Sequence, residues 1–288
     1  MRALIVGSTS SLAKVLKPAL MQLGEVLLAG RRHADIALDL NASAEEMALP
    51  ADLDAIVHAA AHFGGKTDED IRQAQSVNVL GTLKLCQAAV RARARHLVLI
   101  SSIYADAGAS SGHAAPSGND NIYALSKRHA DELAQFYCAA HGLPLCILRP
   151  TQLYGDGDEF RRHQPFFYHL ADQAQAAREV TLYGTHDARR NYLHAEDLAH
   201  IISLTIQQRI TGVYACGHPH DVTYSQVAEA AFAAFATEKR IRFLADKADI
   251  PDHIYPVNDA LYRLIGFTPR ISIEAGLKRI ALFRASRP

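Results

Sequence analysis

The sequence has no excess of either charge, because its 30 lysines and arginines balance its 30 aspartates and glutamates. No tract of one sign stands out that would bind a phosphate backbone or an anionic membrane. Long apolar runs are missing as well: the start offers no signal-peptide core before Gly7, and no later run reaches the length of a membrane span. We therefore expect a cytoplasmic protein that binds small molecules and neither nucleic acid nor a membrane.

Cysteine is scarce and shows no arrangement for a disulfide framework or a metal. The four cysteines form no Cys-x-x-Cys pair, and a chain of this size needs no disulfide staples. Histidine is plentiful, but its members show no i, i+4 pairing with a third ligand. We predict no metal site. The cysteines are interpreted as small apolar residues that fill space, namely Cys86, Cys138, Cys146 and Cys216. The histidines are interpreted as solvated or hydrogen-bonded, namely His58, His62, His113, His163 and His194.

At 288 residues the chain is long enough for a large α/β unit with a smaller appendage. Short runs of almost wholly apolar residues alternate with helical stretches, as strands covered by helices on both faces require. Strands are expected at 3–6, 26–29, 36–38, 56–59, 97–100 and 145–148, and helices at 11–23, 77–90, 123–141 and 227–235, the last preceded by a capping box of Thr223 and Gln226.

This alternation predicts an α/β fold with a doubly wound parallel, Rossmann-like sheet and a small C-terminal substrate-binding lobe. Residues 1–150 are expected to form the dinucleotide-binding domain with the catalytic residues. Residues 151–288 are expected to complete the sheet and form the smaller lobe. The stretch 105–121, rich in Gly, Ser, Ala and Pro, is predicted to be a mobile active-site loop.

The turn after the first strand has the place of a dinucleotide-binding loop but an incomplete glycine pattern. A Gly-x-x-Gly-x-x-Gly fingerprint would have glycines at 7, 10 and 13, whereas the chain has Gly7, Ser10 and Ala13. The free amides at the start of the following helix suit a pyrophosphate. We predict cofactor contacts from Gly7, Ser8, Thr9, Ser10, Ser11 and Leu12, with an ordinary strand-helix turn as the alternative.

Two arginines follow the second strand, where an NAD enzyme usually presents a carboxylate to the adenosine ribose. Arg31 and Arg32 suit a 2′-phosphate instead, so the sequence predicts NADP, with NAD possible and with solvated surface arginines as the alternative. Further cofactor contacts are expected at the ends of the third and fourth strands, from Asp39, Leu40, Ala59, Ala60 and Ala61.

Tyr123 and Lys127 stand four residues apart at the start of a predicted helix, so the phenol and the ammonium share one face. An ammonium, together with an oxidised nicotinamide, can lower the pKa of a phenol toward the range of acid-base catalysis. Ser101 and Ser102 end a buried strand and are expected to reach the same crevice. We predict Ser102, Tyr123 and Lys127 as catalytic residues and prefer Ser102 to Ser101, because it lies farther out of the strand.

Taken together, these features resemble the extended short-chain dehydrogenase/reductase family, also called the NAD-dependent epimerase/dehydratase family. The resemblance covers nearly the whole chain. It rests on Gly7-x-x-Ser10-x-x-Ala13, His58-Ala-Ala, Asn78 in Val-Asn-Val-Leu-Gly-Thr, Ser101-Ser102, Tyr123-x-x-x-Lys127, Leu148-Arg-Pro-Thr-x-x-Tyr154-Gly, Arg190-Asn-Tyr-Leu-His-Ala-Glu-Asp197 and the closing segment 264–277.

The resemblance implies further roles. Ser102, Tyr123 and Lys127 would form the catalytic triad, and Asn78, Ser101, Tyr123, Lys127, Pro150 and Thr151 would contact the cofactor. Substrate contacts would come from His62, Ser102, Ile103, Tyr154 and Arg190, the last meeting a substrate diphosphate. A homodimer through the helices at 77–90 and 123–141 is expected as well.

Departures from the family pattern narrow the expected activity. Ile103 and Tyr104 stand where family dehydratases carry an Asp-Glu pair, which disfavours a 4,6-dehydratase. The leading prediction is an NADP(H)-dependent oxidoreductase that transfers hydride at one carbonyl or carbinol carbon, as a keto-sugar (nucleotide-sugar) reductase. A nucleotide-sugar 4-epimerase is the alternative enzyme, and a non-catalytic dinucleotide sensor is the alternative of another class.

Overall fold

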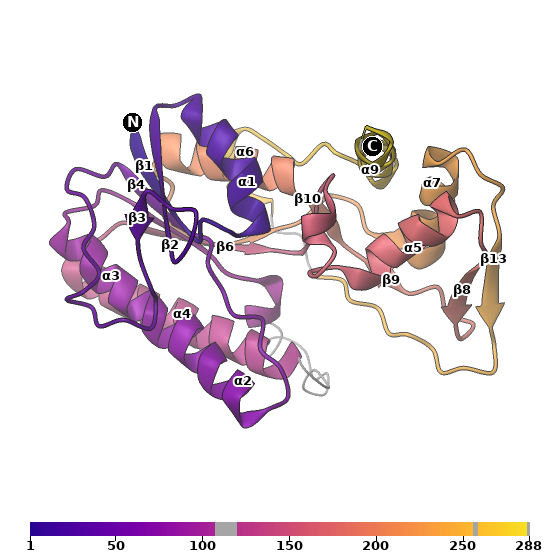
Figure 1. Ribbon diagram of the computed structural model, residues 1–288, viewed down its shortest axis with the longest axis horizontal. Helices are drawn as coiled ribbons and strands as arrows, with labels where there is room; N and C mark the ends of the chain where they lie inside the picture. Colours follow the sequence, from indigo (N-terminus) through magenta and orange to yellow (C-terminus); the bar gives the residue numbers. More distant parts are fainter. Residues whose placement is uncertain (107–119, 256–258, 287–288) are drawn as a thin grey trace. The chain divides into compact units, whose positions relative to one another are not determined.

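The computed structural model describes residues 1–106, 120–255 and 259–286 (Figure 1). The chain divides into two compact units. Unit 1 comprises residues 1–150, 199–215 and 260–265, and unit 2 comprises residues 151–198, 216–259 and 266–288. The stretch 105–121, for which we predicted a mobile loop, lies largely outside the described residues.

Unit 1 is built on a seven-stranded sheet in the order β3-β2-β1-β4-β5-β6-β11. Its strands are β1 (Arg2–Val6), β2 (Glu25–Gly30), β3 (Ile36–Ala37), β4 (Ala55–His58), β5 (Leu97–Ile100), β6 (Leu145–Pro150) and β11 (Gly212–Cys216). All pairs from β3 to β6 are parallel. The chain winds outward from β1 in both directions, as in a Rossmann fold. The predicted fold class is confirmed.

Helices cover both faces of this sheet. Figure 1 shows α1 (Ser11–Met21) and α6 (Ala195–Gln207) on one face and α3 (Gly81–Arg91) and α4 (Asp120–His141) on the other. Every residue of β4 and β5 is therefore buried, which explains why these strands read as unbroken apolar runs. The remaining helical segments of unit 1 are α2 (Asp68–Gln73), the π-helix η1 (Ala74–Leu80), the 3-10 turn η2 (Ile103–Ala105) and α8 (Ala260–Ile265).

The parallel strands bring distant segments together at one edge of the sheet. Val6 at the end of β1 pairs with Ala29 of β2 and with His58 of β4. The segments that follow these strands therefore leave the sheet as neighbours, and Ser101 directly follows β5 in the same direction. This carboxyl edge is where doubly wound sheets bind ligands.

Unit 2 packs three helices with three short two-stranded sheets. The helices α5 (Pro165–Gln175) and α9 (Ile273–Ala285) both contact α7 (Tyr224–Ala234). The strand pairs are β7 (Gln152–Tyr154) with β10 (Tyr192–His194), β8 (Val180–Tyr183) with β13 (Ile241–Leu244), and β9 (Arg189–Arg190) with β12 (Val222–Thr223); η3 (Asp158–Phe160) is a 3-10 turn. The predicted capping box is confirmed: Thr223 Oγ1 accepts from Gln226 N at 3.2 Å, and Gln226 Oε1 accepts from Thr223 N at 2.8 Å.

Two further expectations concern the cysteines and helices that could span a membrane. All four cysteines are buried free thiols. Within the described residues, no helix is both long and apolar enough to pass through a bilayer.

Candidate active site

The turn after β1 requires a glycine at position 7. Gly7 has φ +108°, and a Cβ there would lie 2.8 Å from the backbone nitrogen of Ala60. Only glycine therefore lets β1 and the segment after β4 approach so closely. Ser10 caps α1, with its Oγ accepting from Ala13 N at 3.1 Å. The Ser10 hydroxyl, offered to a phosphate in our sequence analysis, is engaged in this cap, while Thr9 is exposed at the turn.

The segment after β2 is fastened to the same turn. Ser8 Oγ donates to the carbonyl oxygen of Arg32 at 2.7 Å, and a Cβ on Gly30 would clash with that hydroxyl. The side chains of Arg31 and Arg32 are exposed, and neither has a hydrogen bond or ion pair to any other described residue. Two cations thus stand beside the glycine turn without an ion-pair partner in the part of the chain that the structure describes.

The other predicted cofactor residues of unit 1 differ in exposure. Asp39 is exposed and its Oδ1 accepts from Asn41 N at 3.0 Å, whereas Leu40 is buried against Gly81. Ala59, Ala60 and Ala61 follow β4 and are half-buried. Asp39 and the alanine segment therefore offer surface to a ligand, while Leu40 packs in the core.

Asn78 connects the segment after β4 to α4 through hydrogen bonds. Its Oδ1 accepts from His62 N at 2.7 Å and its Nδ2 donates to His62 O at 2.8 Å. The same Nδ2 donates to Ser126 Oγ on α4 at 2.9 Å. Asn78 lies in the π-helix η1, a geometry that often marks functional sites. In the structure, Asn78 positions neighbouring segments and its amide is fully used within the protein.

Tyr123 and Ser102 meet at the carboxyl edge. A hydrogen bond from the Ser102 hydroxyl lowers the pKa of the Tyr123 phenol, but burial has the larger effect and raises that pKa above its ordinary value of about 10. The loss of hydration outweighs this hydrogen bond. The lowering of the phenol pKa by Lys127 together with an oxidised nicotinamide stays a prediction.

Lys127 is almost fully buried, with 4% of its surface exposed. Its Nζ donates to the Ile100 carbonyl oxygen at 2.8 Å and lies 5.9 Å from the centre of the Tyr123 ring. Burial lowers the pKa of the ammonium to about 8, although Asp131 raises it. Ser102, Tyr123 and Lys127, which the sequence singled out, are thus brought together by β5 and α4.

Sequence reasoning missed three residues around this group. Asp131 and Arg149 form a largely buried ion pair behind Lys127, with 2.9 Å between Oδ2 and Nε. Phe63 stacks on the Tyr123 ring at 5.5 Å between centroids. The spacing of Asp131, four residues after Lys127 on one helix, could have identified it as a neighbour. Nothing in the sequence around Phe63 indicated the stack.

Some predicted substrate and cofactor residues are buried. Ile103 in η2 is 3% exposed, Pro150 ends β6 as a buried residue, and Tyr154 of unit 2 has no exposed surface. Arg190 is 3% exposed, because its Nη1 donates to Arg189 O and Pro251 O and its guanidinium lies over the Tyr224 ring. Ile103, Tyr154 and Arg190 are thus packed within the protein, and their contacts with a substrate stay predictions. Each was assigned from the family pattern, which carries no information on burial.

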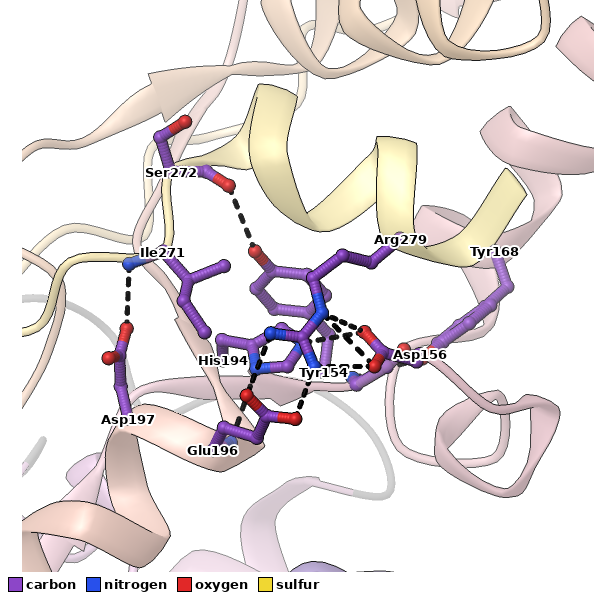
Figure 2. A network of polar contacts seen from close by, with 10 residues as sticks. Tyr154, Asp156, Tyr168, His194, Glu196, Asp197, Ile271, Ser272 and Arg279 are labelled. Atoms are coloured by element: carbon purple, nitrogen blue, oxygen red, sulfur yellow. Dashed lines mark hydrogen bonds and ion pairs between the residues drawn. The ribbon is translucent and has the colours of Figure 1, made fainter. Parts of the chain in front are cut away.

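Tyr154 and His194 are the buried members of a partly exposed polar network in unit 2 (Figure 2). The Tyr154 hydroxyl donates to Ser272 O on the segment before α9. Arg279 of α9 binds both Asp156 and Glu196. His194 Nε2 lies 3.0 Å from Asp156 as well. Thr151, at the start of unit 2, is half-buried and its Oγ1 bonds Asn191 Oδ1 at 3.0 Å. This network connects β7, β10, α6 and α9 within one unit.

Comparison with known proteins gives consistent relatives. The profile described as NAD dependent epimerase/dehydratase family matches residues 3–217. CDP-abequose synthase of Salmonella typhimurium is 26% identical over 165 residues, 57% of this chain and 52% of that protein. dTDP-glucose 4,6-dehydratase of Streptomyces niveus is 29% identical over 233 residues, 78% of this chain and 68% of that protein. The chain thus spans about half to two thirds of the length of these relatives.

Solved structures show the same fold over the whole chain. The crystal structure of UDP-N-acetylglucosamine 4-epimerase from Bacillus cereus superposes with a TM-score of 0.80 at 19% identity, covering 100% of this chain and 98% of that one. The family profile, the fold and the Ser102, Tyr123 and Lys127 group agree with one another. The chain belongs to the NAD-dependent epimerase/dehydratase family of extended short-chain dehydrogenase/reductases, which is a family of enzymes.

Proposed function

We propose that this enzyme is an NADP(H)-dependent reductase of a keto group on a nucleotide-linked sugar. The observation that carries the cofactor choice is the pair Arg31 and Arg32, exposed and without ionic partners in the described residues, beside the Gly7 turn. A 2′-phosphate bound there would neutralise them through charge-assisted hydrogen bonds. Since the chain belongs to a family of enzymes, we set the non-catalytic sensor alternative aside.

The residues of unit 1 fit such a cofactor. The absence of a Cβ at Gly7 leaves the turn closed against Ala60 with the start of α1 directly behind it, where amides and the helix dipole favour a pyrophosphate. Lys127 is proposed to hold the nicotinamide ribose, and Thr151 with Pro150 to line the nicotinamide. The cofactor, when bound, supplies the hydride. Asp39 and Ala59 to Ala61 are proposed to bound the adenosine half.

Tyr123 is proposed to supply the proton. Because burial raises the pKa of its phenol, Tyr123 is protonated at neutral pH and can donate to the oxygen of a carbonyl as that oxygen gains charge. The Ser102 hydroxyl lies beside the phenol and is proposed to donate a second hydrogen bond to the same oxygen. A protonated phenol is the form that reduction requires, whereas oxidation of a carbinol would require the phenolate.

The substrate class is proposed from the relatives. CDP-abequose synthase and dTDP-glucose 4,6-dehydratase carry nucleotide-linked sugars in their names. The absence of the Asp-Glu pair at Ile103 and Tyr104 disfavours the dehydratase reaction for this chain. A 4-keto-6-deoxyhexose linked to CDP or dTDP is therefore the first candidate to test.

A homodimer remains part of the proposal. Leu80 of η1 and both Leu125 and Phe136 of α4 are large apolar side chains that stay exposed, Phe136 with 74% of its surface. Large apolar side chains that remain exposed on the helices expected at a dimer interface favour this assignment. Sedimentation at micromolar concentration, with wild type compared with Phe136→Glu, tests this assignment.

The activity test follows NADPH absorbance while the enzyme is given CDP- and dTDP-linked 4-keto-6-deoxyhexoses. A reductase consumes one NADPH for each keto sugar. A 4-epimerase would leave added NADPH unconsumed and interconvert the C4 hydroxyl epimers of a nucleotide sugar, which product analysis with the corresponding saturated sugars detects. Epimerisation without net NADPH consumption would contradict the proposal and favour the alternative enzyme.

A further inference from the structure

The buried ammonium of Lys127 has little compensation from groups directly bonded to it. The one hydrogen bond that its Nζ makes to another described residue goes to the Ile100 carbonyl at 2.8 Å, a dipole without net charge. A cation removed from water in this way is unfavourable unless an opposite charge lies close by. The carboxylate that raises its proton affinity is Asp131, one helical turn further along α4.

Asp131 is itself fully buried, with 0% of its surface exposed. Its Oδ2 accepts from Arg149 Nε at 2.9 Å. Burial raises the pKa of the carboxyl, while Ser101, Arg149 and Lys127 act in the opposite direction. A buried carboxylate that is bonded to Arg149 and lies one helical turn from Lys127 therefore favours the charged form of both cations.

The other charged and titratable groups around this pair do not replace Asp131. On β4, burial lowers the pKa of His58 to about 3, so this imidazole is neutral. On α4, the Arg128 guanidinium is directed to Ala105 O. Asp106 binds Arg149 at 3.2 Å, but its side chain is 53% exposed.

We propose that Asp131 is a positioning residue of the active site: its carboxylate supplies the negative charge that keeps the Lys127 ammonium protonated and in place, and Arg149 fixes that carboxylate. Lys127 in turn lies next to Tyr123, and its Nζ donates to the Ile100 carbonyl at the end of β5. The positive charge of the ammonium is therefore held close to the predicted proton donor. The inference rests on the proposed function only in giving Lys127 a role toward cofactor and phenol.

The sign of the pH effect follows from the direction of the shift. Lys127 has a folded pKa of about 8, below its ordinary value near 10.4, so the unfolded chain binds more protons between these values and stability rises with pH there. Without Asp131 the folded pKa falls further. Below about pH 8, Asp131→Asn thus buries an uncompensated ammonium, and above it the lysine is neutral and the deficit shrinks.

The first experiment needs no activity. Urea unfolding is measured from pH 6.5 to 9.5 for wild type, Asp131→Asn, Lys127→Met and the double variant, which forms a double-mutant cycle. We expect a coupling at pH 6.5 equivalent to at least about a tenfold change in the proton affinity of Lys127, declining as the pH rises. An equal deficit for Asp131→Asn with and without Lys127, at every pH, would mean that Asp131 serves only the fold.

The second experiment reads cofactor binding and turnover. The alkaline limb of NADPH binding and of the reductase rate should move down by at least about one pH unit in Asp131→Asn and return toward wild type in Asp131→Glu. Asp106→Asn, which removes the exposed carboxylate on the same arginine, is the matched control and should not move it. An unmoved limb in Asp131→Asn would overturn the proposal.

Failure of the proposed function is distinguishable from failure of this inference. If no keto sugar is reduced, the alkaline limb of the pH dependence of NADPH binding still reports on the protonation of Lys127. If NADPH does not bind, the double-mutant cycle of urea unfolding still reports on it. If Asp131→Asn does not fold, the cycle is run with Asp131→Glu, whose carboxylate is displaced by one methylene. That variant should show a partial coupling, and an unchanged pH dependence there would count against the role of Asp131.

Discussion

Each unit contains a cluster of charged residues, buried in unit 1 and partly exposed in unit 2, and the charges of the two clusters are balanced in opposite ways. In unit 2, Arg279 is held by two carboxylates, Asp156 and Glu196, and His194 adds a further bond to Asp156. In unit 1, Lys127 donates one hydrogen bond, to a backbone carbonyl. The Asp131 carboxylate acts on its charge and is at the same time ion-paired with Arg149. In unit 2, two carboxylates bind the one guanidinium of Arg279. In unit 1, the one carboxylate of Asp131 acts on two cations.

The pKa values differ accordingly. Hydrogen bonds with Glu196 and Asp156 raise the pKa of Arg279, and although burial raises the pKa of Asp156, its bonds to His194 and Arg279 hold it below the ordinary value. In unit 1, burial instead lowers the pKa of Lys127 to about 8. Groups whose pKa is shifted toward neutral pH are typical of functional sites, whereas groups that keep their charge across this range are typical of structural sites.

The largest expected effect comes from removing the proposed proton donor. Tyr123→Phe should keep the fold and cofactor binding and lose at least about 10²-fold in turnover, because only the transferable proton is removed. Steady-state kinetics and thermal unfolding of the same preparation measure the two quantities. Near wild-type turnover in a folded variant would remove Tyr123 from the catalytic group.

The two serines at the end of β5 sharpen the contrast within unit 1. Ser102 lowers the pKa of the Tyr123 phenol, whereas Ser101 lowers the pKa of the Asp131 carboxyl. Ser102→Ala should lower turnover by about ten- to a hundredfold, because one hydrogen bond to a charged oxygen contributes roughly 1.5–3 kcal/mol. Ser101→Ala is the matched control, with an expected loss of less than about tenfold. Equal losses would show that the two hydroxyls are not divided in this way.

A smaller effect is expected from the structural cluster of unit 2. Arg279→Met should reduce the free energy of unfolding by about 1–2 kcal/mol at pH 7, since the pair is only partly buried. Asp156 has a depressed pKa in the folded state, so its contribution is present above about pH 4 and is lost on acidification. Urea unfolding at pH 7 and at pH 3.5 tests this: the difference between wild type and variant should shrink at the lower pH. A constant difference would mean that packing, not charge, is responsible.

Much of unit 1 could be predicted because its strands are buried on both faces. Runs such as 97–100 are apolar throughout and end at the residues expected, and Gly24 and Gly142 mark helix ends by their left-handed backbone. The single helix expected at 77–90 is instead the π-helix η1 followed by α3. The change of pitch accompanies the bonds that Asn78 makes to other segments, which periodicity cannot show.

Unit 2 was less predictable, because its elements are short and depend on contacts distant in sequence. The strands β8 and β13 pair with each other although some 60 residues separate Val180 from Ile241. α5 begins with Pro165 and follows a polar stretch, so it gave no strong periodic signal. The spacing of Tyr123 and Lys127 predicted that the two side chains lie close together, whereas the burial of Tyr154 and Arg190 follows only from packing.

The central claim is the choice of NADP(H), and it is tested by titrating NADPH and NADH against wild type and Arg31→Asp at one salt concentration. We predict that wild type binds NADPH more tightly, since each charge-assisted contact to the 2′-phosphate contributes roughly 1.5–3 kcal/mol. In the variant, repulsion of the phosphate and an acceptor for the free ribose hydroxyl should reverse the preference. A wild type that prefers NADH, or a variant with unchanged discrimination, would contradict the account and favour the epimerase.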